Sequence, residues 1–572
     1  MTPAREAGWP GAPGSVAASL PSAPPAAVAA ARFGVDKKLL RLWAASTALC
    51  GAVVTLMVWL GIPGWDTAAH LYKAELVHDG YSIFWDNYWY GGSYGSVNYG
   101  FVYYWLVQAI PAAIIITVAA GLVPVLFLIY QRRLWGIDDV WPAWSFAAVM
   151  GMYLAHGQDP FILSLAMCLG GLALLARGRP GWGALPVAVS VFVNPMGLVV
   201  TSVLMGADVL ARPETRRRYA VFAALLAPVI GIRFAMGVVF AEPGNYLNET
   251  SQMLIYLGFA LAGVALAGVN ATHARRPFII LFLLYAAVCL CSFVTPQSPL
   301  GNNVGRFFLV FGLPLMLLLR HSRLRRPFTY GELVVIPIVL FALLQMSTPL
   351  DHYFSRDELP QTKAAFFAPA LEVAGQLCDE DHRIHVVALR RHWEALYFPA
   401  AGFPITRGWY RQADAIHNGI FYGDYDAAEY AAWLRRMGVE YVFLANAPLD
   451  PWSEHEARLL EDANEFTLVR KAGAWTVYGV SRPEGMVVGL DGGTGHLTHM
   501  GHRSFGLTVD RPGTYLVKCT WTPYWRLVGD GTLTKGRDGF VSLRAPRAGA
   551  YVAVFEFTPQ RALACLTGRA GG

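Results

Sequence analysis

The feature that most constrains this chain is a series of apolar runs, each long enough to form a membrane helix, which ends at residue 349. A run of about 20 apolar residues spans a bilayer as a helix. Only 15% of the residues are charged, against about 25% in an average soluble protein. This excludes an ordinary cytosolic enzyme and a disordered protein. The sequence predicts a helical membrane domain over residues 36–349, followed by a soluble half.

Basic residues beside the runs indicate which helix ends face the cytoplasm. The first run, residues 39–62, follows Lys37, Lys38 and Arg41, so the positive-inside rule places the N-terminus in the cytoplasm. Further spans are predicted up to Tyr130 and at 140–156, 161–176, 219–240, 251–272, 277–295, 306–320 and 329–349.

One apolar stretch, residues 183–210, does not fit a single span, because arginines flank both of its ends. Asn194 and Pro195 lie at its middle, and a proline disfavours helix at the residue before it. We therefore expect a hairpin of two short helices with its tip at Asn194. About eleven helices then place every arginine cluster on the cytoplasmic side and the C-terminal half outside the cell.

The N-terminal tail, the basic residues and the cysteines argue against a signal peptide, nucleic-acid binding and a metal site. Residues 1–35 are rich in Ala, Pro and Gly and lack the apolar core of a signal peptide, so a disordered cytoplasmic tail is expected. The basic residues follow membrane topology, so no nucleic-acid partner is predicted. The 7 cysteines form no metal-site pattern, and Cys378, Cys519 and Cys565 leave open at most one disulfide in the soluble half.

The densest group of candidate residues lies in the polar segment after the first run, residues 63–100, which we call the first loop. Asp66, His70 and Lys73 have helical spacing and could share one helix face. A helix N-cap is the structural alternative for Asp66. Aromatic residues fill the rest of the loop, as in an interfacial belt, yet sugars also stack on aromatic rings and bind carboxylates and amides. The sugar-binding candidates are Trp85, Asp86, Tyr90, Asn98 and Tyr99.

These features together resemble the GT-C superfamily, which are membrane glycosyltransferases that use polyprenyl-phosphate sugars. The likeness lies in a carboxylate after the first span, a long aromatic first outer loop, a broken helix pair and a soluble C-terminal domain outside the cell. The stretch WDNYWYGGSYGSVNYGFVYYW, residues 85–105, is similar to actinobacterial GT-C-like proteins related to arabinosyl- and mannosyltransferases, as is the segment from RGWYRQAD to YAAWLRRMGVEYVFL.

The resemblance implies an inverting transferase in a bacterial plasma membrane, with a lipid-linked sugar as donor and an envelope glycan or glycolipid as acceptor. In that family the first-loop aspartate is the general base, a role that the resemblance assigns to Asp66. A carboxylate in reach of a sugar hydroxyl takes its proton as the hydroxyl attacks. A cation would help the phosphate to leave, and the candidates are His70, Lys73 and Arg306. No Asp-x-Asp lies near Asp66, so no metal is predicted, nor any cofactor besides the donor.

Each remaining candidate has a structural alternative. Arg306 could snorkel to the membrane interface instead. His156 and Asp159 lie in a short outer turn, where Asp159 is either a second carboxylate of the site or a helix cap. Asn194 is expected to be structural.

The soluble half is predicted to form two extracytoplasmic domains. Residues 350–482 mix helix and strand signals, which indicates an α/β domain, and residues 483–572 alternate like the short strands of a β-sandwich. In the α/β domain Arg407, Trp409 and Arg411 are candidates to bind the acceptor, with a packed interdomain loop as the alternative.

Two other functions compete with the transferase. A transporter or flippase of lipid-linked sugars typically shows internal repeats and charged residues at the midplane, whereas here no repeat is clear and the polar residues cluster in the outer loops. A non-catalytic envelope-assembly protein with a glycan-binding ectodomain is the third reading. The sequence favours the transferase.

Overall fold

The computed structural model describes residues 36–61, 63–81, 84–94, 99–241, 249–269, 275–295, 301–319, 340 and 359–566. The predicted tail 1–35, the sugar-binding candidate Asn98 and all of the predicted span 329–349 except Leu340 lie outside these residues. The described residues from Leu42 onward belong to one compact unit, and all the contacts of the site lie within it.

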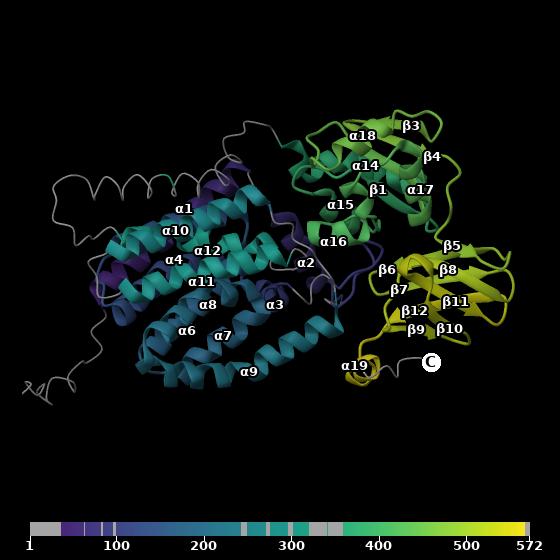
Figure 1. Cartoon of the computed structure of the whole chain (residues 1–572). Helices are drawn as coiled ribbons and strands as arrows, with labels where there is room; N and C mark the ends of the chain where they lie inside the picture. The colour runs from purple at the N-terminus through teal and green to yellow at the C-terminus, as the bar shows by residue number, and fades with distance from the viewer. Residues whose placement is uncertain are drawn as a thin grey trace, which may run out of the picture. The chain divides into compact units, whose positions relative to one another are not determined.

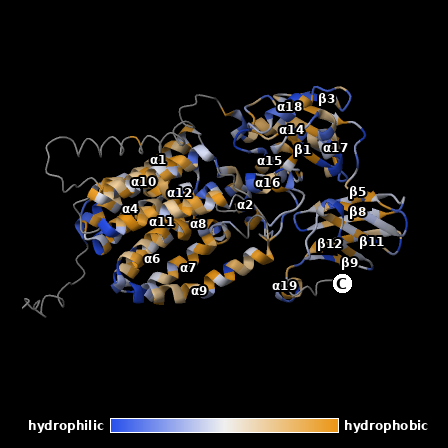
Figure 2. Ribbon diagram, in the orientation of Figure 1, coloured by the Kyte–Doolittle hydropathy of each residue, from blue (hydrophilic) through white to orange (hydrophobic). Residues whose placement is uncertain are grey.

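The N-terminal half is helical, as its apolar runs predict, and Figure 2 shows apolar residues along its helices. Within the described residues, seven helical segments are long and apolar enough to cross a membrane, which confirms a multi-span membrane protein. The helices are α1 (Lys37–Leu60), α2 (Thr67–His78), α3 (Phe101–Ala109), α4 (Ala112–Tyr130), α5 (Trp141–His156), α6 (Asp159–Ala176), α7 (Pro180–Val193), α8 (Pro195–Ala211), α9 (Arg216–Val239), α10 (Thr250–Val269), α11 (Arg275–Val294) and α12 (Gly305–Leu318) (Figure 1).

The structure has the hairpin that the sequence predicts. Helix α7 ends at Val193 and α8 begins at Pro195, with Asn194 extended between them at φ −162°. The Asn194 side chain accepts the N–H of Met196 at 2.9 Å, so this residue caps α8. Asn194 is fully buried, and the structural role expected for it is confirmed.

The apolar stretch that ends at Tyr130 is not one helix. It is divided into α3 and α4 at Ile110 and Pro111, because Ile110 is extended and the residue before a proline disfavours helix. The short helix α3 lies beside α2, which keeps the first loop close to the helix that follows it.

The first part of the soluble half is a mixed four-stranded sheet with helices on both faces. The strand order is β1-β2-β4-β3, with β1 (Arg383–Val386) parallel to β2 (Val439–Ala445), and β3 (Phe466–Ala472) antiparallel to β4 (Trp475–Val480). Helices α14 (Ala364–Leu377) and α15 (Glu394–Ala400) pack on one face, and α17 (Ala427–Met437) packs on the other. Helix α16 (Arg411–His417) precedes α17, and α18 (Glu454–Leu459) follows β2.

The second part is a β-sandwich, which confirms a β-rich C-terminal region. Its two antiparallel sheets have the orders β10-β11-β8-β5 and β6-β7-β12-β9 (Figure 1). The elements are β5 (Val487–Gly489), β6 (Gly495–Gly501), β7 (Ser504–Val509), β8 (Gly513–Thr520), β9 (Trp525–Val528), β10 (Thr532–Lys535), β11 (Phe540–Ala545), β12 (Gly549–Phe555) and a final helix α19 (Pro559–Leu566).

The first loop joins the cores of both soluble domains. Trp85 packs in the core of the β-sandwich, whereas Trp89 and Tyr72 pack with α14 and α15 in the core of the α/β domain. Helix α2 therefore has one face against the soluble domain, and its N-terminal end carries Asp66.

Candidate active site

Asp66 lies on a short connection between α1 and α2 that touches the turn between α5 and α6. A Cβ atom on Gly64 would lie only 2.6 Å from backbone atoms of Gly157, so the two backbones meet where neither has a side chain. The N–H of Trp65 donates to the carbonyl of His156 at 2.9 Å. Gly157 has φ +75°, a conformation that glycine adopts without strain. Two segments 92 residues apart in sequence are thereby brought together.

The carboxylate of Asp66 is aimed at the neighbouring turn rather than at its own helix. Asp66 precedes α2, but its side chain makes no capping hydrogen bond. Its Oδ2 accepts from the Nε2 of Gln158 at 2.8 Å, and the residue is only 7% exposed. The cap alternative therefore does not describe this side chain.

Gln158 connects Asp66 to a cation. The Nη1 of Arg306 donates to the Oε1 of Gln158 at 2.6 Å, and its Nε donates to Asn303 at 3.0 Å. The guanidinium also lies over the ring of Phe161, 4.9 Å from its centre. Arg306 is half-buried and faces the site, so snorkelling alone does not account for its position. Gln158 was not among the residues that the sequence singled out.

Tyrosines and a second carboxylate border this cluster. Asp159, in the first turn of α6, accepts a hydrogen bond from the hydroxyl of Tyr103 at 3.1 Å. The ring of His70 stacks on that of Tyr99, and its Nδ1 lies 3.0 Å from the hydroxyl of Tyr104. The buried Nε2 of His70 has no hydrogen-bond partner within the described part of the chain.

Burial sets the protonation of the two titratable groups at the start of α2. Burial raises the pKa of Asp66 to about 7, with Arg306 lowering it and Asp159 raising it further. Burial lowers the pKa of His70 to about 4, so its ring is neutral at pH 7. Asp66 is therefore poised as a base near neutral pH, and His70 acts there as a neutral group rather than as a cation.

The other candidates of the first loop lie outside this cluster. Lys73 is 1% exposed; its Nζ is 4.3 Å from the centre of the Trp89 ring and 3.6 Å from a carboxylate oxygen of Asp86. Asp86 also lies 3.0 Å from the Nδ1 of His502 in the β-sandwich. Burial opposes ionisation of Asp86, but His502 and Lys73 hold its pKa down at about 2. We therefore assign Lys73 and Asp86 to the attachment of the loop.

Trp85 and Tyr90 serve the same attachment. Trp85 is 2% exposed, and its ring stacks on that of Phe555 in the β-sandwich. The hydroxyl of Tyr90 donates to the carbonyl of Tyr410 at 2.9 Å. The aromatic residues that the sequence suggested for sugar binding are, in these two cases, packed between domains.

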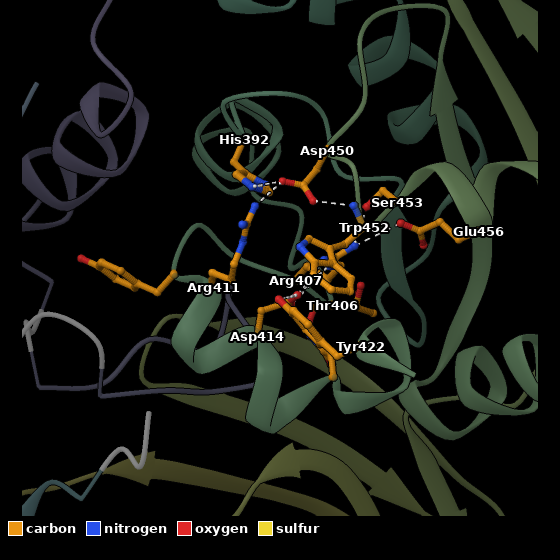
Figure 3. A network of polar contacts seen from close by, with 12 residues as sticks. His392, Thr406, Arg407, Arg411, Asp414, Tyr422, Asp450, Trp452, Ser453 and Glu456 are labelled. Carbon is orange, nitrogen blue, oxygen red and sulfur yellow. Dashed lines mark hydrogen bonds and ion pairs between the residues drawn. The ribbon is translucent and has the colours of Figure 1, made fainter. Parts of the chain in front are cut away.

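The α/β domain contains a separate buried polar network around Arg407 (Figure 3). Arg407 is 6% exposed; its Nε and Nη2 donate to the Asp414 carboxylate, and its Nη1 donates to Ser453 and Glu456. These contacts use the donors of the guanidinium, and they fit the packed-loop alternative. Trp409 is half-buried, whereas Arg411 is exposed and donates to Asp450 at 2.8 Å.

Possible metal ligands lie elsewhere. In the part of the chain that the structure describes, Asp379, His382 and Glu440 bring ligand atoms within 4.8 Å of one another. The Nδ1 of His382 already lies 2.8 Å from Asp379 and 3.4 Å from Glu440, so direct contacts between these side chains explain the group. Cys378, Cys519 and Cys565 are all free thiols in the structure.

The backbone contact at Gly64 should be essential for the geometry around Asp66. A Gly64→Ala substitution places a methyl group against Gly157 and should separate Asp66 from Gln158. A displacement of about 1 Å at a reacting group can cost about 100-fold in rate, so we expect transfer activity to fall about 10- to 100-fold without unfolding. Gly181→Ala is the control, because its Cβ would meet nothing within 4 Å. Equal activity of both variants would contradict the role of this contact.

No protein-family model matches the sequence, and no curated protein matches it. Solved structures that are similar at a low level include the arabinofuranosyltransferase AftD from Mycobacteria, at 16% identity and a TM-score of 0.44 over 80% of this chain. This chain spans 41% of the AftD chain. ArnT from Cupriavidus metallidurans, bound to undecaprenyl phosphate, is 13% identical with a TM-score of 0.38, over 79% of this chain and 100% of that one. Both TM-scores are below 0.5, so the proposals below rest on this chain's own residues.

Proposed function

We propose that this protein is an inverting membrane glycosyltransferase of the GT-C type, which moves a sugar from a polyprenyl-phosphate donor to a cell-envelope glycan or glycolipid outside the cell. The observation that carries the proposal is the Asp66–Gln158–Arg306 cluster. It combines a base with a pKa near 7 and a cation, joined by one amide and set at the ends of membrane helices.

The reaction assigns a separate task to each of these groups. The acceptor hydroxyl attacks the anomeric carbon from the face opposite the phosphate, and the bond from that carbon to the phosphate oxygen breaks. Asp66 takes the hydroxyl proton during the attack. The electron pair of the broken bond leaves with the lipid phosphate, whose negative charge Arg306 stabilises. The Nη2 of Arg306 makes no hydrogen bond to any residue the structure describes, so it can serve that phosphate.

Gln158 keeps the two groups in a fixed relation. Its amide N–H₂ donates to Asp66 while its carbonyl oxygen accepts from Arg306, so one side chain orients both. A glutamine holds this geometry without adding a charge that would cancel the base or the cation. His70 and Tyr99 lie beside Asp66 as neutral polar groups that can contact the sugar.

The proposal is tested by following the donor and the acceptor together. Purified protein in lipid nanodiscs would be incubated with labelled polyprenyl-phosphate sugars and envelope glycans, and cells with and without the protein would be compared for both pools. We expect transfer of label to the glycan, and cells without the protein should accumulate the lipid-linked sugar. If the protein instead moved intact lipid-linked sugar between the two leaflets of a liposome bilayer, without cleaving the bond between sugar and phosphate, the result would support a flippase and overturn the proposal.

A further inference from the structure

Two consecutive residues of the α/β domain adopt a conformation that side chains disfavour. Arg391 and His392, just before α15, have φ values of 74° and 51°. Residues with a Cβ atom rarely take positive φ, and they persist there only when the surrounding structure holds them. Both residues have such contacts, and the contacts of Arg391 lead to the segment that carries Asp66.

Arg391 reaches from the soluble domain to the connection between α1 and α2. It is 3% exposed, and its Nη1 donates to the carbonyl oxygen of Pro63 at 2.9 Å. Its guanidinium also lies over the ring of Trp65, 5.5 Å from the ring centre. Pro63 and Trp65 are three and one residues before Asp66, so Arg391 contacts the segment that carries the proposed base.

His392 is held between two carboxylates. Its Nδ1 lies 3.1 Å from an oxygen of Glu394 on α15, and its Nε2 lies 3.3 Å from Asp450 in the loop after β2. Arg411 on α16 donates to the same Asp450 oxygen at 2.8 Å (Figure 3). Burial opposes a charge on His392, but Asp450 and Glu394 raise its pKa to about 9, so the ring stays charged at neutral pH. This charged contact holds the turn that presents Arg391.

The same domain also packs against α2 itself, just after Asp66. Ala68 and Ala69 of α2 pack in one apolar core with Ala395 and Leu396 of α15, the helix that follows the Arg391–His392 turn. In the first loop, the indole N–H of Trp89 donates to the carbonyl of Ala395 at 2.8 Å. The α/β domain therefore contacts the chain both just before and just after Asp66.

We propose that Arg391 is a positioning residue for the transfer reaction, which holds Asp66 against Gln158 through Pro63 and Trp65, and that the contact of His392 with Glu394 and Asp450 keeps Arg391 in place. This inference rests on the proposed function. It gives the soluble domain an indirect part in the reaction, since the turn before α15 sets the position of the base through Pro63 and Trp65.

The test compares Arg391→Met with wild type, and Arg435→Met serves as the matched control. Arg435 also donates to a backbone carbonyl of the α/β domain, that of Ser481, but it makes no hydrogen bond or ion pair with the residues of the first loop that the structure describes. For Arg391→Met we expect kcat to fall about 10- to 100-fold with the KM for the lipid-linked donor unchanged, and with the same Tm as wild type. Arg435→Met should leave kcat unchanged. A kcat for Arg391→Met equal to that of wild type would overturn the proposal.

Two further measurements keep the test decisive. If Arg391→Met lowers the Tm, the variant Arg391→Lys is used in its place. Lysine keeps the positive charge near Trp65 but lacks the guanidinium, so Arg391→Lys should fold and have a kcat between those of Arg391→Met and wild type. A kcat equal to that of wild type would overturn the proposal. Hydrogen exchange of the backbone at 64–70 needs no substrate, and it should be faster in Arg391→Met than in Arg435→Met. If exchange is faster in Arg391→Met but the wild-type protein transfers no sugar, the proposed function is wrong, whereas the inference that Arg391 orders residues 64–70 still holds. Unchanged exchange would overturn the positioning role.

Discussion

Asp66→Asn should leave the protein folded and lower transfer from a lipid-phosphate sugar by about 1,000-fold, the middle of the range that general bases contribute. Asparagine keeps the size of the side chain, and its amide oxygen can still accept the hydrogen bond from Gln158. It cannot take a proton from the acceptor hydroxyl. The measurement is the rate of sugar transfer in nanodiscs at saturating donor, together with the Tm of both proteins.

Asp159→Asn is the control, because it removes the other carboxylate close to the site. Asp159 raises the pKa of Asp66, so its removal should lower that pKa and shift the acid limb of the rate profile to lower pH. The rate at pH 8, where Asp66 is already ionised, should change little. Loss of activity in Asp159→Asn with full activity in Asp66→Asn would exchange the roles of the two carboxylates.

The parts of this protein that the sequence predicts well are those set by local pattern. The apolar runs and the arginines beside them locate the membrane helices, and Pro195 predicts the break after α7. Asp66 is singled out by its place directly after the first apolar run and by the resemblance to the GT-C superfamily. Each of these signals depends on neighbouring residues in the chain, which is why the sequence alone is sufficient for them.

The partners of Asp66 depend on contacts between distant segments. Gln158 is one polar residue in a short turn, and it becomes part of the site only because Gly64 and Gly157 let two backbones touch. Lys73 has the helical spacing that suggested a shared face, but at 1.5 Å per residue it lies about 10 Å along the helix from Asp66. There it meets Asp86 and Trp89, which belong to a later part of the loop.

The soluble half shows the same limit. Arg407 lies in a segment rich in groups that bind sugars. The residues of this segment are equally suited to an exposed sugar-binding surface and to a buried polar network. Its partner Asp414 is seven residues away, but Ser453 and Glu456 come from beyond α16, α17 and β2, so only the fold decides between a surface position and a buried network. Arg391 has no motif around it, and its contact with Pro63 joins residues 328 positions apart.

Arg306→Gln should lower kcat by about 100-fold or more, because removing one preorganised donor to a developing charge typically costs about 100- to 1,000-fold. Glutamine can still form one hydrogen bond with Gln158, but it has no charge for the departing phosphate. The substitution should also change the pH profile. The pKa of Asp66 is about 7, a value that already includes the lowering effect of Arg306. Wild-type activity should therefore fall as the pH drops below about 7, because the base becomes protonated.

Without Arg306 the pKa of Asp66 rises, so the acid limb of Arg306→Gln should move to higher pH, opposite to the shift expected for Asp159→Asn. The measurement is kcat from pH 5 to pH 9 for wild type and both variants. Arg306→Lys separates charge from geometry. It restores the charge and with it the wild-type acid limb, but its single nitrogen cannot reproduce the fork in which Nε bonds Asn303 and Nη1 bonds Gln158, so kcat should recover only in part. An acid limb at the same pH in all the variants would mean that Asp66 is not the group whose ionisation limits the rate, and the base would then have to be sought among the other groups that line the cluster.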